Sequence, residues 1–513
     1  MSKKIAQIRK VISFTFVLVV MGFGCGKEKG ISENTTKENT LKKATKIEKV
    51  LKTTVSMDLD SLNPYEIVSS SSEEITLNIY EGLLMPSDDG GLKNAIAESY
   101  TVSEDGLVYT FQIRKGIKFH NGNNLDIKDV EFSLNRMSGK DGSPLASSAF
   151  DNIDKITVLD DNYIAITLKK ANVSFIYHLT EAIVPDENKE TLSKNAIGTG
   201  PFKLASYEKE QKIVLEKFDD YWDNKAHLEK VEILVTPNAD AAFLKLISGE
   251  INFLQYVNSE RVNEIKDYNI KSSSQNMVQV MALNHKFEPF GDHRVREAIN
   301  LGIDKEKIID AVMNGYGEPL ETHMGPLMKD LSIPKLGTKR NVERAKELLK
   351  EAGQENLSFT IRVPSNYSVH VNTAQMVVEQ LKEIGVTAKI ETIEWATWLD
   401  DVYSKRNYEV TIVGLSGKLD PDAVLKRYTS TYSKNFFNYN NTEYDQLISE
   451  ANVTFDNEKR ANLYKKAEII LRDDNAAVYI MDIHNVVALK NGFGGYVFYP
   501  LPYINFSKIT IGE

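Results

Sequence analysis

Several short stretches contain residue types that carry catalysis in other proteins, but their spacing does not form an active site. Gly414-Leu415-Ser416-Gly417 lacks the G-x-S-x-G spacing that exposes a nucleophilic serine. Gly198-Thr199-Gly200-Pro201-Phe202-Lys203 does not fit a phosphate-binding loop, because Pro201 removes a backbone donor and Lys203 is misplaced. The eight histidines are scattered, and no H-E-x-x-H motif is present. We therefore predict that the chain is not an enzyme, and we expect no metal and no cofactor.

Cys25 is the only cysteine of the chain, which excludes a disulfide within one molecule. Four basic residues and an apolar run over 11–21 precede it. This run is shorter than the roughly 20 residues that span a membrane, so residues 1–24 are predicted to be a signal peptide.

The position of Cys25 resembles the lipidated cysteine of bacterial lipoproteins, although Gly22 stands where that motif usually has leucine. Residues 25–49 are then expected to be a lipidated cysteine followed by a flexible polar tether. The alternative is an ordinary signal peptide followed by an incidental free thiol.

Aromatic residues are numerous, with 23 Tyr, 21 Phe and 3 Trp. Trp395 and Trp398 are three residues apart, so they would share one face of a helix. Either both tryptophans pack into a core, or Trp395 forms the wall of a ligand pocket, a role that suits its large apolar ring.

The elements that position these residues follow a strand–helix–strand order in the second half of the chain. Strands are predicted over 358–363, 387–393 and 409–414, with a helix over 373–384, and this order is typical of a parallel sheet. Ligands of open α/β sheets lie beyond the carboxyl ends of the strands. The loops 394–398 and 415–422 are therefore candidate ligand-binding segments.

Hydrophobic periodicity predicts further strands and helices, which together indicate an α/β fold. The strands are expected over 53–59, 108–113 and 163–168, and the helices over 73–84, 239–247, 342–352, 443–452 and 458–472. At 513 residues the chain exceeds the usual size of a single hydrophobic core. Its formal charge of −10 argues against nucleic acid as a partner.

Several blocks of sequence together resemble family 5 of the extracellular solute-binding proteins, which includes oligopeptide-, dipeptide- and nickel-binding proteins. The blocks occur in the family's order, and they are Tyr80-Glu81-Gly82-Leu83, the stretch 109–136 with Phe119-His120-Asn121-Gly122, Gly198-Thr199-Gly200-Pro201-Phe202, Tyr221-Trp222, and 290–299 with Asp292-His293-Arg294-Val295-Arg296. The resemblance extends over roughly 52–506.

This resemblance implies a two-lobed, type II periplasmic-binding-protein-like α/β fold with mixed sheets, an extra subdomain and a hinge. The first lobe would comprise residues 50–80, 200–283 and 489–513, the extra subdomain 81–199, and the second lobe 284–488. Such proteins close on their ligand by a hinge motion.

The same resemblance implies a monomeric, membrane-anchored receptor on the periplasmic or outer side of the membrane. It would deliver short peptides to the permease of an ABC importer. The implied ligand-binding residues are Val68, Ser69, Ser70, Tyr80, Trp395, Gly414, Ser416, Gly417, Lys418, Asp420 and Asp422. The alternatives are a receptor for a metal chelate or another small organic ligand, a secreted hydrolase, and an adhesin.

One position departs from the pattern of the peptide-binding members. They carry an aspartate that pairs with the ammonium group of the peptide, and Lys418 stands at that position here. Either Asp420 or Asp422 takes the role of this aspartate, or the ligand is not held by its amino terminus. Asp420-Pro421-Asp422 is also consistent with a simple turn.

Overall fold

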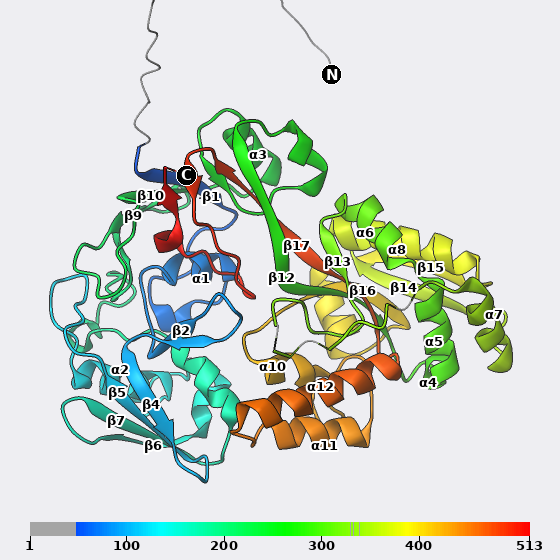
Figure 1. Cartoon of the computed structure of the whole chain (residues 1–513), viewed down its shortest axis with the longest axis horizontal. Coiled ribbons are helices and arrows are strands. Elements are labelled where there is room, and N and C mark those ends of the chain that lie inside the picture. The colour runs from blue at the N-terminus through cyan, green and yellow to red at the C-terminus, as the bar shows by residue number, and fades with distance from the viewer. Residues whose placement is uncertain (1–47, 329, 332, 338, 513) are drawn as a thin grey trace, which may run out of the picture. The chain divides into compact units, whose positions relative to one another are not determined.

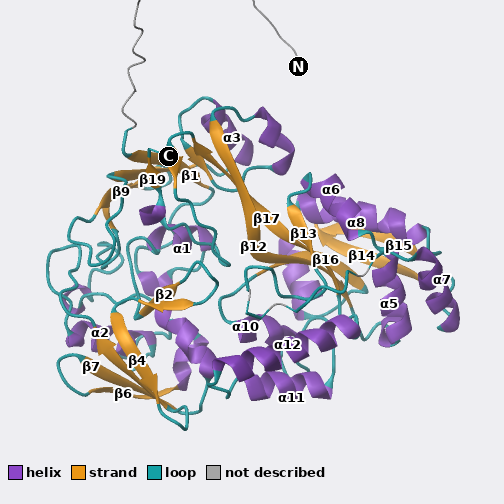
Figure 2. Ribbon diagram, viewed as in Figure 1, coloured by secondary structure: helices purple, strands orange, loops and turns teal. Residues whose placement is uncertain are grey.

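The computed structural model describes residues 48–512 apart from 329, 332 and 338. The predicted signal peptide, Cys25 and nearly all of the tether lie outside the described residues. The described chain contains both helices and strands (Figure 2), and the sheets include parallel and antiparallel pairs. The predicted α/β class with mixed sheets is confirmed.

Two four-stranded sheets are built mainly from the first half of the chain. One has the order β1 (Val50–Val55), β10 (Lys230–Val235), β9 (Lys212–Lys217) and β8 (Phe202–Glu208), with β1 and β10 parallel. The other is antiparallel, with the order β4 (Ala97–Val102), β5 (Val108–Ile113), β7 (Tyr163–Leu168) and β6 (Ile153–Val158). The strands predicted over 108–113 and 163–168 are confirmed.

The largest sheet has seven strands, drawn mainly from the second half of the chain. Its order is β11 (Phe253–Leu254), β17 (Val478–Lys490), β12 (Tyr268–Leu283), β16 (Val410–Ser416), β14 (Ser358–Pro364) and β15 (Thr387–Ile393), and β13 (Gly317–Pro319) pairs with β17. Helix α8 (Ser368–Lys382) connects β14 to β15, which are parallel. The predicted strand–helix–strand unit is therefore confirmed.

The remaining elements are helices that cover the sheets and a few short strands. The helices are α1 (Ser70–Thr76), α2 (Ile127–Met137), α3 (Ala239–Ile247), α4 (Glu288–Gly291), α5 (His293–Gly302), α6 (Lys305–Met313), α7 (Val342–Glu351), α9 (Trp395–Thr397), α10 (Pro421–Leu425), α11 (Thr442–Ala451) and α12 (Asn457–Asp473). The short strands are β2 (Leu84–Pro86), β3 (Leu92–Asn94), β18 (Phe493–Gly494) and β19 (Thr510–Ile511). Among the described residues, no helix combines the length and apolar character that a membrane span requires.

The sequence pattern of the large sheet explains why it is buried on both faces. Val278, Val280 and Ala282 of β12 face one hydrophobic core, and the alternate residues Met281 and Leu283 face another. Successive side chains of a strand point to opposite faces, so a continuous apolar run fits a sheet that is covered on both sides.

The strands β12 and β17 are unusually long and run side by side in the middle of the view (Figure 1). Val478 and Ile480 of β17 belong to the core around α5–α8, whereas Val487 and Leu489 belong to the core around β1, β9 and β10. This antiparallel pair therefore connects two separate hydrophobic cores.

The pairing of β12 with β17 is interrupted between Ser274 and Val278, where Asp482 supplies the missing hydrogen-bond acceptors. The Asp482 side chain is fully buried and accepts a hydrogen bond from the Ser274 hydroxyl. It also accepts hydrogen bonds from the backbone N–H groups of Asn276 and Met277, each at 3.1 Å. Asn276 has a left-handed backbone conformation (φ 58°), as expected where a strand bulges.

The predicted helix over 73–84 is wrong from residue 77 onward, because α1 ends at Thr76. The Asn78 side chain donates to the carbonyl of Ile504 (2.8 Å) and accepts from the backbone N–H of Phe506 (3.0 Å). These long-range bonds draw the chain out of the helix. The first strand also ends earlier than predicted, at Val55 instead of residue 59.

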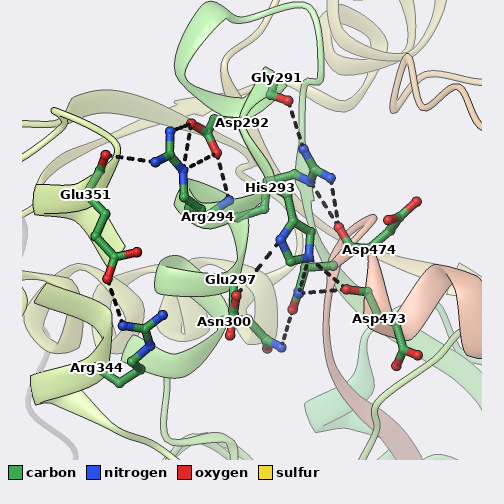
Figure 3. A network of polar contacts seen from close by, with 12 residues as sticks. Gly291, Asp292, His293, Arg294, Glu297, Asn300, Arg344, Glu351, Asp473 and Asp474 are labelled. Carbon is green, nitrogen blue, oxygen red and sulfur yellow. Dashed lines mark hydrogen bonds and ion pairs between the residues drawn. The ribbon is translucent and has the colours of Figure 1, made fainter. Parts of the chain in front are cut away.

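The motif around residues 290–299 forms a polar network that joins α5 to α7 and to the end of α12 (Figure 3). Arg294 is paired with Asp292 and donates to the backbone carbonyl of Glu351 at 2.8 Å. A nitrogen of the His293 ring lies 2.8 Å from the carbonyl of Asp473. This block of the resemblance therefore has a structural role.

We predict that Asp482→Ala lowers the free energy of unfolding by about 3 kcal/mol or more, because it leaves several buried donors unpaired. Ser274→Ala removes a single donor and should cost only about 1–2 kcal/mol. Urea denaturation of both variants measures the difference. Equal losses for the two variants would contradict the role given to the carboxylate.

Candidate binding site

A cavity of about 350 Å³ is lined by segments from distant parts of the sequence. Its walls come from residues 64–86, from 146–182, from the loop 417–423 that follows β16, and from Leu501 and Pro502. A volume of this size lies within the range of small-molecule sites in proteins. The cavity is therefore our candidate binding site.

Four of the predicted ligand-binding residues line this cavity, namely Tyr80, Gly417, Lys418 and Asp420. The Tyr80 hydroxyl donates to the carbonyl of Leu62 at 2.7 Å, so this bond fixes the orientation of its ring. The loop starts later than predicted, because β16 continues through Leu415 and Ser416.

Trp395 and Gly414 line a different cavity, of about 280 Å³. Trp395 stacks on Trp398, with ring centroids 5.0 Å apart and planes 3° from parallel. Trp398 is buried and its indole N–H donates to the Thr411 hydroxyl at 2.9 Å. Trp398 is thus a core residue, Trp395 packs against this core, and both rings reach the wall of the second cavity.

Val68, Ser69 and Ser70 line neither of these two cavities. Val68 is 86% exposed, and the backbone N–H groups of Val68 and Ser69 donate to Asp60 at 2.9 and 2.8 Å. Ser69 is also the N-cap of α1. In this structure the three residues therefore form the turn that starts α1.

Ser416 and Asp422 also lie outside the walls of both cavities. Ser416 is exposed at the end of β16, and its carbonyl accepts a hydrogen bond from Arg427 at 3.3 Å. The carboxylate of Asp422 is buried and accepts from the Asn452 amide at 2.8 Å.

Asp420 has a structural role in addition to its place in the cavity wall. Its Oδ1 atom caps α10 by accepting from the backbone N–H of Asp422 at 3.0 Å. The same atom accepts from the Ser174 hydroxyl at 2.8 Å. Burial and the neighbouring Asp422 carboxylate raise the pKa of Asp420 to about 7.

Sequence reasoning missed Glu73, Tyr177, His178 and Glu181, which also line the cavity. Burial, together with the Glu73 carboxylate, raises the pKa of Glu181 to about 7. Burial, with Lys426 and Lys418 nearby, lowers the pKa of His178 to about 4, so this ring is neutral at pH 7. The one signal in the sequence is that Glu181 stands directly before the apolar stretch 182–185.

The motif blocks of the first half of the chain meet at Glu81, beside the cavity. The buried Glu81 carboxylate accepts hydrogen bonds from the Thr199 hydroxyl (2.9 Å), the Trp222 indole (2.9 Å) and the Tyr221 hydroxyl (2.8 Å). His120 belongs to the same junction, because its Nε2 atom lies 3.0 Å from the carbonyl of Gly200.

Glycines allow the backbones of this junction to approach each other closely. A Cβ atom on Gly198 would lie 2.1 Å from the carbonyl oxygen of Ile79, and one on Gly82 would lie 2.4 Å from that of Leu179. Real Cβ atoms do not occur at such distances, so these positions require glycine.

The cavity contains no constellation typical of catalysis. Within the described part of the chain, no group of three His, Cys, Asp or Glu side chains is placed to hold a metal ion. The walls of the cavity combine aromatic rings with charged groups of both signs. This arrangement suits the binding of a polar ligand.

Comparison with known proteins points to a single family. The sequence profile described as "Bacterial extracellular solute-binding proteins, family 5 Middle" matches residues 91–474. The oligopeptide-binding protein AppA of Bacillus subtilis (strain 168) is 28% identical over 468 residues, which cover 84% of this chain and 85% of that protein.

Solved structures with the same fold include two substrate-binding proteins of ABC transporters. CtaP from Listeria monocytogenes is similar with a TM-score of 0.81 and 27% identity, and the match covers 90% of this chain and 99% of that chain. DppA from Helicobacter pylori, solved in complex with the peptide STSA, has a TM-score of 0.72 and 28% identity, with 90% and 98% of the chains covered. These similarities confirm the predicted two-lobed binding-protein fold.

We predict that Gly198→Ala lowers the free energy of unfolding by at least about 2 kcal/mol, because the new methyl group overlaps the backbone of Ile79. Gly291→Ala is the matched control, since the nearest atom to its Cβ would be 3.9 Å away, and its change should stay within about 1 kcal/mol. Urea denaturation compares the two variants. A Gly198→Ala protein as stable as the control would refute the close approach.

Proposed function

The chain belongs to family 5 of the bacterial extracellular solute-binding proteins, and from this membership we propose that it captures short peptides for an ABC importer. The peptide binds in the cavity of about 350 Å³ and is passed unchanged to a membrane permease. The relatives reported above are substrate-binding proteins and not enzymes, so the chain binds its substrate without a chemical step.

The observation that carries this proposal is the composition of the cavity wall. Glu73 and Glu181 are acidic, Lys418 is basic, and Tyr65 and Tyr177 add aromatic surface. A peptide with free ends carries one positive and one negative charge, and both meet a complementary group in such a cavity. Aromatic walls bury apolar side chains without selecting one of them strongly.

Three of the five hydrophobic core clusters of the described chain support the division that the resemblance implies. We assign residues 50–80, 200–283 and 489–513 to the first lobe, 81–199 to the extra subdomain and 284–488 to the second lobe. One cluster gathers residues from 83 to 183, a second combines β1, β9 and β10 with the C-terminal segment and with four residues between 182 and 196, and a third surrounds α5–α8. A peptide stabilises the closed form of such a protein only through its higher affinity for that form.

Lipidation of Cys25 would keep the receptor at the outer face of the membrane, near its permease. The polar stretch 25–49 would act as the tether. Tethering raises the effective concentration of the receptor at its transporter without any additional contact. We propose that the receptor acts as a monomer, as the resemblance implies.

We predict that a bound peptide at 100 times its dissociation constant stabilises the folded protein by about 2.7 kcal/mol. The measurement is the Tm of the purified protein with a series of peptides of two to eight residues. Mass spectrometry of compounds that co-purify with the protein identifies the natural ligand. If no peptide raises the Tm and a metal chelate does, the chain is instead a chelate receptor, in which Lys418 contacts an acidic chelator.

We predict that Cys25→Ser releases the protein from the membrane fraction, because the lipid attachment is lost. Western blotting of the membrane and soluble fractions of cells that express either form measures the release. A Cys25→Ser protein that stays in the membrane fraction would rule out anchoring through this residue.

A further inference from the structure

The ammonium group of the ligand needs an acidic partner in the cavity, and Asp420 is poorly placed for this role. Its Oδ1 atom already accepts two hydrogen bonds, from Ser174 and from the backbone of Asp422. Asp422 is outside the cavity wall and accepts from Asn452. Asp420 is moreover buried, whereas Glu181 is half-buried, so we assign Asp420 and Asp422 mainly to fixing α10.

Glu181 is an acidic group of the cavity that has remained free to bind a ligand. Within residues 48–512, leaving aside 329, 332 and 338, its half-buried carboxylate forms no hydrogen bond and no ion pair. The hydroxyl groups of Tyr65 and Tyr80, which line the same cavity, donate instead to the carbonyls of Ala182 (2.9 Å) and Leu62 (2.7 Å). Partial burial of a carboxylate without a donor is unfavourable, and a bound cation would offset this cost.

The backbone around Glu181 is held rigidly by the junction at Glu81. The backbone N–H of Ile183 donates to the carbonyl of Glu81 at 2.8 Å. Gly82 lets the same segment approach closely, because a Cβ there would lie 2.6 Å from the carbonyl oxygen of Glu181. With Tyr65 bound to Ala182, the backbone of Glu181 is fixed before any ligand arrives, which reduces the entropic cost of binding.

The charges around Glu181 favour a cation over an anion at this point of the cavity. The Glu73 carboxylate lies close enough to raise the pKa of Glu181, and Lys418 acts on Glu73 in the opposite direction. The ammonium group of a ligand would stand beside both glutamates, which leaves Lys418 available for the carboxylate of the same ligand.

We propose that Glu181, assisted by Glu73, binds the free α-ammonium group of the peptide in place of the aspartate that other peptide-binding members use. This inference rests on the proposed function, since it specifies how the same cavity recognises its ligand. The receptor should accordingly select peptides by a free amino terminus and be indifferent to most side chains.

The affinity should depend on pH because the bound ammonium requires an ionised Glu181. With a pKa of about 7, this carboxyl is mostly protonated at pH 5, and its proton must leave when the ammonium binds. The affinity is therefore expected to rise between pH 5 and pH 7. The other titratable groups that line the cavity are Tyr65, Glu73, Tyr80, Tyr177, His178, Lys418 and Asp420, and of these Asp420 titrates in the same range.

The test compares Glu181→Gln with Asp420→Asn by isothermal titration calorimetry at pH 5 and pH 7. Both changes keep the shape of the side chain, and asparagine at position 420 can still cap α10. The ligands are the alanine peptide of two to eight residues that binds the wild type best and its N-acetylated form. These peptides carry no charged side chain, so their only cation is the α-ammonium group.

We expect Glu181→Gln to lower the affinity at pH 7 about 10-fold to 100-fold, as for loss of a hydrogen bond to a charged group. The dependence on pH should nearly disappear in this variant, while Asp420→Asn should lower the affinity much less than Glu181→Gln and should retain the rise with pH. The N-acetylated peptide should bind the wild type about as weakly as the free peptide binds Glu181→Gln.

Two results would overturn the inference and leave the proposed function intact. One is a Glu181→Gln protein that binds the free peptide as the wild type does, and the other is an Asp420→Asn protein that alone loses binding. Thermal denaturation without ligand checks that the variants are folded. If the wild type binds no peptide of the series, the proposed function fails, and this inference fails with it.

Discussion

Glu81 buries its carboxylate at the point where three separate stretches of the chain meet, and its hydrogen bonds hold the other two stretches against its own. Thr199, Tyr221 and Trp222 supply the donors. A carboxylate is costly to bury, and three donors at 2.8–2.9 Å offset that cost only in this one arrangement. The wall of the cavity that contains Glu181 continues directly from this junction, so the geometry of the binding site depends on a residue that does not line it.

This arrangement explains why the sequence blocks identify the family but not the ligand. Glu81, Gly82, His120, Gly198 and Trp222 meet at one structural junction. Changes at these positions would damage the scaffold whatever the ligand is. The groups that are free to contact a ligand, such as Glu181 and Lys418, lie outside or at the edge of the blocks. At those positions the fold is compatible with many residue types.

The elements with strong local signals were predictable from the sequence. The helix α3 and the strands β5 and β7 have the predicted bounds, because their periodicity, capping residues and turns all favour the same structure. The end of α1 was not predictable, since Asn78 is bound by residues more than 400 positions away in the sequence. Long-range hydrogen bonds override local helical preference there.

The candidate site was predictable only in part, for a similar reason. Tyr80 and Lys418 were identified through the resemblance, and both line the larger cavity. The apolar stretch after Glu181 is too weak a signal to separate it from an ordinary surface glutamate, because its place in the cavity wall depends on distant segments such as Gly82, which packs against its backbone. Trp395 lines the smaller cavity and Asp420 lines the larger one. Only the tertiary structure determines which cavity each residue lines.

The bulge at Asp482 has a mechanical consequence for the long strands β12 and β17. Over most of their length the strands are joined by a ladder of backbone hydrogen bonds, and bending such a ladder strains many bonds together. Between Ser274 and Val278 the ladder is replaced by bonds to one carboxylate, so fewer bonds between the strands oppose bending there. We therefore expect the ribbon that links the two cores to bend more easily at this bulge than along its regular ladder.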